Sequence, residues 1–155
     1  MHTRSATRAD LPAICDVVFA VGREYGYEPE PEGADLDLFE QVDRYFEEGG
    51  LLRVLLDGDE VVGVLGLVRE DAQTTELRKL YLLPRVRGGG HGRAFLEEAI
   101  AFARRRGAER LILQSTSRFE RALTLYERAG FRQVNGEMRS PTCDRMMELQ
   151  LRSGL

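Results

Sequence analysis

The stretch Arg85-Val86-Arg87-Gly88-Gly89-Gly90-His91-Gly92-Arg93 decides the fold of this chain. It follows a strand-like segment that Pro84 ends, and it precedes apolar residues at helical spacing. Because glycine has no side chain, the backbone can turn tightly here and direct several N–H groups to one point. The start of a helix and the arginines add positive charge. The stretch therefore predicts a phosphate-binding loop, and a glycine-rich turn that binds nothing is the alternative.

Two common phosphate-binding motifs do not fit this stretch. The Walker loop needs a glycine followed by Lys-Ser or Lys-Thr, and the chain contains no such tripeptide. The dinucleotide-binding fingerprint needs three spaced glycines, but its third position falls on Arg93 when counted from Gly88 and on Phe95 when counted from Gly90. The stretch also follows a hairpin in the middle of the chain. We therefore expect a different class of phosphate ligand.

Apolar spacing on either side of the glycines predicts short strands and helices. Aliphatic or β-branched runs, expected to be strands, are His2–Ala6, Leu51–Leu56, Val61–Val68, Thr75–Leu83, Arg110–Gln114, Phe131–Val134 and Arg145–Leu151. Helices are expected from Leu11, from a cap at Asp35 or Asp37 through Phe46, from Gly92 to Gly107, and over Phe119–Ala129. The first half holds a hairpin at Asp57-Gly58, and strand–helix–strand crossovers occur only in the second half. The order predicts an α/β (α+β) sheet with helices on both faces.

The composition excludes several classes of protein. The chain has 155 residues, 43% of them hydrophobic, which predicts a single domain over residues 1–155 with one sizeable core. No apolar run approaches the roughly 20 residues that span a bilayer, and the first residues lack the apolar segment of a signal peptide. Two cysteines without metal-site spacing predict reduced thiols, no metal and a cytoplasmic location. We expect neither a membrane nor a nucleic-acid partner.

Three segments together resemble the GNAT family of N-acetyltransferases. Arg87-Gly88-Gly89-Gly90-His91-Gly92 matches the family signature (Gln/Arg)-x-x-Gly-x-(Gly/Ala). Upstream, Glu76-Leu77-Arg78-Lys79-Leu80-Tyr81-Leu82-Leu83-Pro84 is similar to the fourth strand of that family. Downstream, Leu125-Tyr126-Glu127-Arg128-Ala129-Gly130-Phe131 resembles its LYEKxGF segment. The resemblance extends over roughly Thr3–Leu151 and includes the order of the elements.

The resemblance implies a fold, a reaction and a donor site. The fold is a mixed, mostly antiparallel sheet of six or seven strands, splayed between strands 4 and 5. The reaction is transfer of an acetyl group from acetyl-CoA to a primary amine, by direct attack in a ternary complex. The backbone of the loop would hold the CoA pyrophosphate, and the fourth strand would pair with the pantetheine arm. The donor-binding residues would be Leu80, Tyr81, Leu82, Arg87, Gly88, Gly89, Gly90, His91, Gly92 and Arg93.

The resemblance also implies two catalytic side chains. Tyr126 occupies the position of the general acid that protonates the CoA thiolate, and packing on a helix face is its alternative role. Glu76 stands eleven residues before Arg87, as in members whose fourth-strand glutamate acts as the base. A glutamate that only pairs with Arg78 or Lys79 is the alternative. Many members carry an asparagine where this chain has Phe119, so no role is transferred to that position.

The acceptor is predicted from charge. Between Glu24 and Glu48 there are ten acidic residues and one basic residue, Arg44, so this stretch has a net charge of −9. The rest of the chain has a net charge of +5. In the family this part of the chain borders the acceptor entrance, so a cationic amine on a small molecule or peptide is expected. A solubilising acidic surface is the alternative. A protein lysine acetyltransferase, a non-catalytic acetyl-CoA sensor and a homodimer all remain open.

Overall fold

The computed structural model describes residues 1–30, 38 and 40–151. Its described residues form a seven-stranded sheet in the order β1-β2-β3-β4-β5-β7-β6. Only the β4–β5 pair is parallel, and the other neighbours are antiparallel. The strands are β1 (His2–Ser5), β2 (Leu51–Asp57), β3 (Glu60–Arg69), β4 (Thr74–Leu82), β5 (Arg110–Ser115), β6 (Arg132–Val134) and β7 (Arg145–Gln150).

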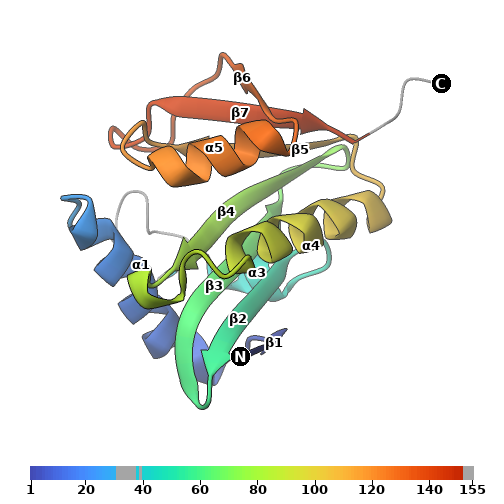
Figure 1. Ribbon diagram of the computed structural model, residues 1–155. Helices are drawn as coiled ribbons and strands as arrows, with labels where there is room; N and C mark the ends of the chain where they lie inside the picture. Colours follow the sequence, from blue (N-terminus) through green and yellow to red (C-terminus); the bar gives the residue numbers. More distant parts are fainter. Residues whose placement is uncertain (31–37, 39, 152–155) are drawn as a thin grey trace.

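Helices cover both faces of the sheet (Figure 1). Apolar residues of α4 (His91–Arg105) and α5 (Glu120–Arg128) pack in one core cluster. Those of α1 (Leu11–Glu24) and α3 (Asp43–Phe46) pack in a second cluster on the other face. Short 3-10 turns, Arg8–Asp10 and Pro84–Val86, precede α1 and the glycine loop. The expected mixed sheet with helices on both faces is confirmed.

The observed helices follow from residue spacing and from glycine. In α4, Phe95, Leu96, Ala99 and Ala103 recur every three or four residues, and all four are buried against the sheet. Gly90 precedes this helix and Gly107 follows it, both with positive φ. Of the helix expected to end at Phe46, the described residues show Leu38 in helical conformation and the short α3. Its predicted caps, Asp35 and Asp37, lie outside the described residues.

The sheet opens between β4 and β5, as the resemblance implied. Their ladder runs from Thr74 opposite Arg110 to Leu77 opposite Leu113, yet β4 continues to Leu82. A bulge begins at the same point. In β3, Gly66 lies opposite Lys79 and Leu67 opposite Leu77, so the register of the ladder skips position 78. Beyond the bulge β4 and β5 diverge, and the edge of β4 that faces β5 is left without a neighbouring strand (Figure 1).

Within the part of the chain that the structure describes, no helix has the length and apolar character needed to cross a membrane. The same residues contain no group of three or more histidine, cysteine, aspartate or glutamate side chains arranged to hold a metal ion.

Candidate active site

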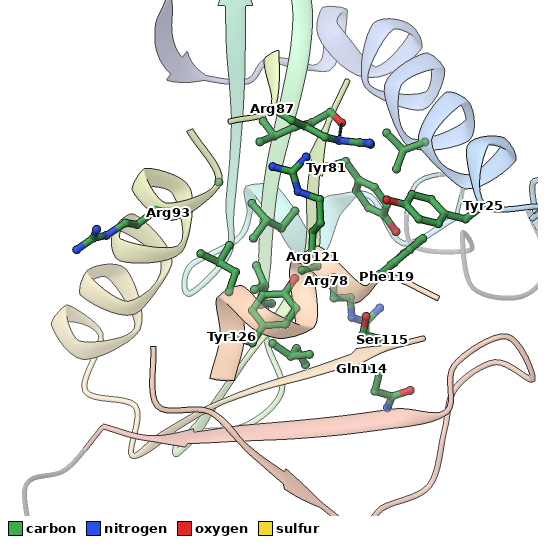
Figure 2. A pocket seen from close by; sticks show the side chains of 18 of the residues that line it. Tyr25, Arg78, Tyr81, Arg87, Arg93, Gln114, Ser115, Phe119, Arg121 and Tyr126 are labelled. Atoms are coloured by element: carbon green, nitrogen blue, oxygen red, sulfur yellow. Dashed lines mark hydrogen bonds between the residues drawn. The ribbon is translucent and has the colours of Figure 1, made fainter. Parts of the chain in front are cut away.

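A cavity of about 310 Å³ lies where β4 and β5 diverge. Its walls come from α1, β4, the glycine loop, β5 and α5 (Figure 2). Leu80, Tyr81 and Leu82, the predicted partners of the pantetheine arm, line it along the open edge of β4. The loop residues that line it are Arg87, Gly88, Gly90, Gly92 and Arg93, whereas Gly89 and His91 do not.

The glycine loop at this cavity contains backbone amides without acceptors among the described residues. Gly88 has a φ of 85° and Gly90 a φ of 84°, a conformation that other residues adopt only with strain. A Cβ atom at either position would meet nothing within 4 Å, so the backbone conformation, rather than a lack of space, requires glycine. Among the described residues, the backbone N–H groups of residues 88–93 have no hydrogen-bond acceptor. The helical hydrogen bonds of α4 begin at Gly90, whose carbonyl accepts from the Ala94 N–H.

The arginines around the loop are mostly held by carboxylates. Arg87 pairs with Glu24 of α1 at 2.7 Å and donates from Nε to the Leu82 carbonyl at 3.1 Å. Arg93 pairs with Glu97 one turn along α4. Arg85 does not line the cavity, because it pairs with Asp57 and Glu60 of the β2–β3 hairpin. The predicted loop is therefore at the cavity, and part of its expected positive charge is neutralised.

Tyr126 lies on α5 and lines the cavity. Arg121, Ala122, Leu125 and Tyr126 follow helical spacing and line one side of the cavity. The Tyr126 side chain is buried beside Phe131, with ring centroids 5.7 Å apart. Burial raises the pKa of its phenol far above the usual range, so the hydroxyl stays protonated. This hydroxyl has no hydrogen-bond partner among the described residues.

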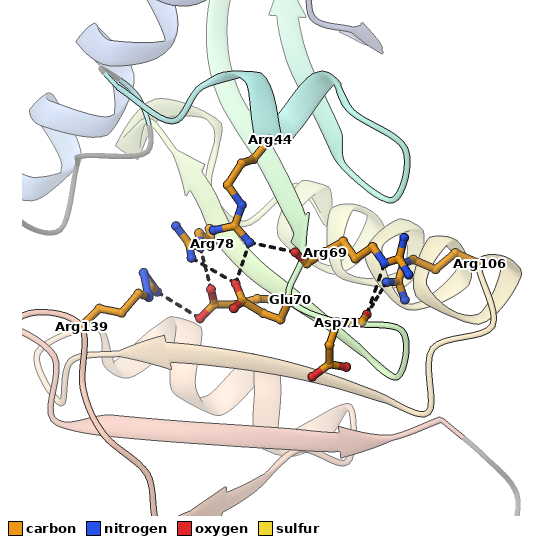
Figure 3. A network of polar contacts seen from close by, with 8 residues as sticks. Arg44, Arg69, Glu70, Asp71, Arg78, Arg106 and Arg139 are labelled. Carbon is orange, nitrogen blue, oxygen red and sulfur yellow. Dashed lines mark hydrogen bonds and ion pairs between the residues drawn. The ribbon is translucent and has the colours of Figure 1, made fainter.

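Glu76 lies in β4 but lines neither this cavity nor the smaller one described below. Its side chain is 2% exposed, and its carboxylate accepts from Arg78 at 2.6 Å and pairs with Arg139 at 3.2 Å (Figure 3). Burial raises the pKa of Glu76, and the two guanidinium groups oppose that effect. Arg78 also reaches Glu70, which Arg44 contacts in turn. Glu76 and Tyr126 are thus not brought together around one cavity.

A second cavity, about 90 Å³, adjoins the first on the α1 side of the sheet. Both cavities are lined by Tyr81, Gln114, Ser115 and Phe119, so they meet at the open end of the β4–β5 gap. Phe119 makes edge-on ring contacts with Tyr25, Tyr27 and Tyr81. An aromatic wall therefore replaces the polar amide expected of many relatives at this position.

Two acids, Glu28 and Glu30, are the only charged residues among the described residues that line the second cavity. Glu30 accepts a hydrogen bond from the buried Ser140 hydroxyl at 3.2 Å, and Tyr27 bonds Thr116 nearby at 2.6 Å. Glu28 also pairs with Arg23 at 3.7 Å, and two further acids of the Glu24–Glu48 stretch are paired outside this cavity, Glu24 with Arg87 and Asp43 with Arg8. Glu32, Asp35 and Asp37 of that stretch lie outside the described residues.

Sequence reasoning missed Arg121, Ser115, Gln114 and the composition of the second cavity. Helical spacing back from Leu125 was a usable signal for Arg121, because residues four positions apart on a helix share a face. No comparable local signal marks Ser140 or Arg139, which reach the site from a loop far along the chain.

Comparisons with known proteins agree with this geometry. A model of the Acetyltransferase (GNAT) family matches residues 17–131. The chain is 33% identical over 137 residues to the uncharacterized N-acetyltransferase YjgM of Escherichia coli, covering 85% of this chain and 82% of that protein. It is 30% identical over 91 residues to the uncharacterized N-acetyltransferase YvbK of Bacillus subtilis, covering 59% of this chain and 58% of that protein.

Solved structures with the same fold include an acetyltransferase of the GNAT family from Staphylococcus aureus. It has a TM-score of 0.88 at 17% identity, with 97% of this chain and 99% of that chain covered. The yncA protein of Salmonella typhimurium, a putative acetyltransferase solved with acetyl-CoA, has a TM-score of 0.74 at 23% identity. That match covers 100% of this chain and 96% of that chain. At these identities the likeness shows the fold.

The loop geometry makes a direct prediction for Gly90→Val. A β-branched residue at this positive φ should displace the loop backbone and its amides, so the ligand implied by the resemblance, acetyl-CoA, should no longer protect the protein. For the parent, ligand at about 100 times its dissociation constant should add about 2.7 kcal/mol to the free energy of unfolding. Thermal unfolding with and without acetyl-CoA measures this difference.

Gly107→Val is the matched control. Gly107 has a φ of 81° and equally open surroundings, but it lies at the far end of α4 and does not line the cavity. It should cost comparable stability and keep the full protection by acetyl-CoA. Equal protection of both variants would show that the loop does not bind the ligand.

Proposed function

The chain belongs to the GNAT family of acetyltransferases, and we propose that it transfers the acetyl group of acetyl-CoA to a primary amine of a small molecule or peptide. We also propose that residues 1–155 work as one domain. The observation that carries the proposal is the pair of adjoining cavities: one runs from unpaired loop amides to Tyr126, and the other is lined by acids. They supply a donor path and an acceptor path that meet inside the sheet.

The donor would bind by two backbone interactions. The free N–H groups of residues 88–93, at the positive end of α4, suit a diphosphate. The open edge of β4 at Leu80–Leu82 suits an extended arm that carries amide groups, because such an arm can add to a sheet as a further strand. Together these interactions would put the thioester near the region shared by the two cavities.

The proposed reaction is direct attack in a ternary complex. The neutral amine attacks the thioester carbonyl from the acceptor cavity, and the tetrahedral adduct then expels the CoA thiolate. Tyr126 would donate its proton to that thiolate, since its buried phenol stays protonated and lines the donor cavity. The contact of the cavities at Tyr81, Gln114, Ser115 and Phe119 supports attack without a covalent enzyme intermediate.

Glu76 is proposed as the base, acting through water. Burial raises its pKa toward the range in which a carboxylate accepts a proton efficiently. Arg139, which pairs with it, precedes Ser140 and Thr142 at the acceptor cavity, so a short water path would join the two. The alternative is that the carboxylate only holds Arg78 and Arg139 in place.

The acceptor is proposed to be a cationic amine. Glu28 lies at the exposed rim, where its ion pair with Arg23 is long at 3.7 Å, and Ser140 donates to Glu30 inside the cavity, so both carboxylates would attract an ammonium group. The cavity volume corresponds to about three water molecules, which suits the end of a linear chain. A lysine side chain of a protein has the same chemistry and remains the second candidate substrate.

The function is tested by release of free thiol from acetyl-CoA over a panel of amines that includes linear diamines, lysine peptides and anionic amino acids. Turnover with an amine is expected, with higher kcat/KM for cationic acceptors and a decline as salt rises. Binding of acetyl-CoA without turnover on any amine would identify a sensor instead of an enzyme.

Glu30→Gln should lower kcat/KM for the best cationic acceptor by about fivefold, the equivalent of about 1 kcal/mol. Glu48→Gln is the control, because this acid belongs to the same stretch but does not line the cavity. Equal behaviour of the two variants, or preference for an anionic acceptor, would mean that the acids only solubilise the surface.

Tyr126→Phe should lower kcat by about 100- to 10,000-fold, the usual effect of removing a general acid. The affinity for acetyl-CoA and the thermal stability should change little, since the hydroxyl has no partner among the described residues. Steady-state kinetics, calorimetric binding and a melting curve check the three expectations. A kcat within twofold of the parent would leave Tyr126 with a packing role only.

Glu76→Gln should abolish the rising limb of the pH dependence of kcat/KM, because that limb would report ionisation of the base. Arg139→Gln provides the comparison: it removes one ion pair from Glu76 and keeps the carboxylate, so the limb should persist at a shifted pH. A limb that is unchanged in Glu76→Gln would exclude Glu76 from the proton path.

A further inference from the structure

We propose that Arg121 binds the diphosphate of the donor from the α5 wall, opposite the glycine loop. This inference rests on the proposed use of a CoA thioester and adds to it a residue outside the family signature segments. Arg121 would supply the net positive charge that the loop itself lacks.

The first argument is charge pairing around the donor cavity. Four basic side chains line it, and three of them already have carboxylate partners: Arg78 with Glu76, Arg87 with Glu24, and Arg93 with Glu97. The fourth, Arg121, has no hydrogen-bond or ion-pair partner among the described residues. Its guanidinium is therefore available to an anionic ligand without breaking an existing contact.

The second argument is position. Arg121 is in the first turn of α5, and Figure 2 shows its side chain extending from this helix across the cavity toward the side where Arg87 lies. The loop amides approach the same cavity from the beginning of α4. A diphosphate at the loop would thus have backbone donors on one side and the Arg121 guanidinium on the other.

The third argument is the chemistry of the ligand. A diphosphate carries two negative charges, whereas amide donors supply only partial charges and Arg87 is neutralised by Glu24. A guanidinium can donate two parallel hydrogen bonds to one phosphate, which a lysine cannot do. The guanidinium of Arg121 would therefore neutralise the diphosphate charge that the loop amides and Arg87 leave uncompensated.

The experiment compares the calorimetric affinities of CoA, dephospho-CoA and pantetheine for the parent and for Arg121→Gln. The variant should bind CoA and dephospho-CoA about tenfold more weakly, because both carry the diphosphate. Its affinity for pantetheine should equal that of the parent. The affinity of Arg121→Lys for CoA should lie between those of the parent and Arg121→Gln, since lysine keeps the charge but cannot donate two parallel hydrogen bonds to one phosphate.

Arg128→Gln is the matched control, because this arginine is also exposed on α5 but does not line the cavity. It should leave all three affinities unchanged. An Arg121→Gln variant that binds CoA like the parent overturns the inference, as does a loss seen with CoA but not with dephospho-CoA, which would indicate contact with the 3′-phosphate. Failure of the parent to bind CoA at all would instead contradict the proposed function.

Discussion

The structure depends on the early end of the parallel pairing between β4 and β5. Their ladder stops at Leu77 and Leu113, although β4 runs on to Leu82. An open strand edge inside a protein is costly unless something pairs with it. The bulge at Arg78 lies where the pairing ends, and the ring contacts of Phe119 with Tyr25 and Tyr81 line the cavity between the two strands. The extended arm of the proposed donor would pair with this open edge.

Charge on β4 keeps the two halves of the sheet together where the opening begins. Glu76 lies opposite Ile112 in the last part of the ladder, and its carboxylate pairs with Arg78 of its own strand. Arg139 reaches the same carboxylate from the segment between β6 and β7 (Figure 3). A buried carboxylate needs such partners, because an unpaired charge in the interior is strongly unfavourable. The network thus connects the loop that carries Ser140 and Thr142 to the strand β4, whose far end is open.

The sequence predicted features that depend on neighbouring residues. The tight turn at the glycines, the helix α4 that follows it and the order of strands and helices along the chain all follow from local spacing and from glycine chemistry. The sequence alone could not predict which side chains from distant segments would pair. Glu76 meets Arg139, and Glu30 meets Ser140, only because the sheet brings remote loops together. Arg85 was expected near the loop, but the hairpin carboxylates of Asp57 and Glu60 hold it elsewhere.

The central claim is that the open edge of β4 receives the donor arm, and amide hydrogen exchange tests it most directly. Saturating acetyl-CoA should slow exchange in peptides that cover residues 78–82 and 88–93. Peptides from β2 (Leu51–Asp57), which is already paired on both sides, should keep their rates. Unchanged exchange in residues 78–82 at saturation, with the ligand demonstrably bound, would contradict the account.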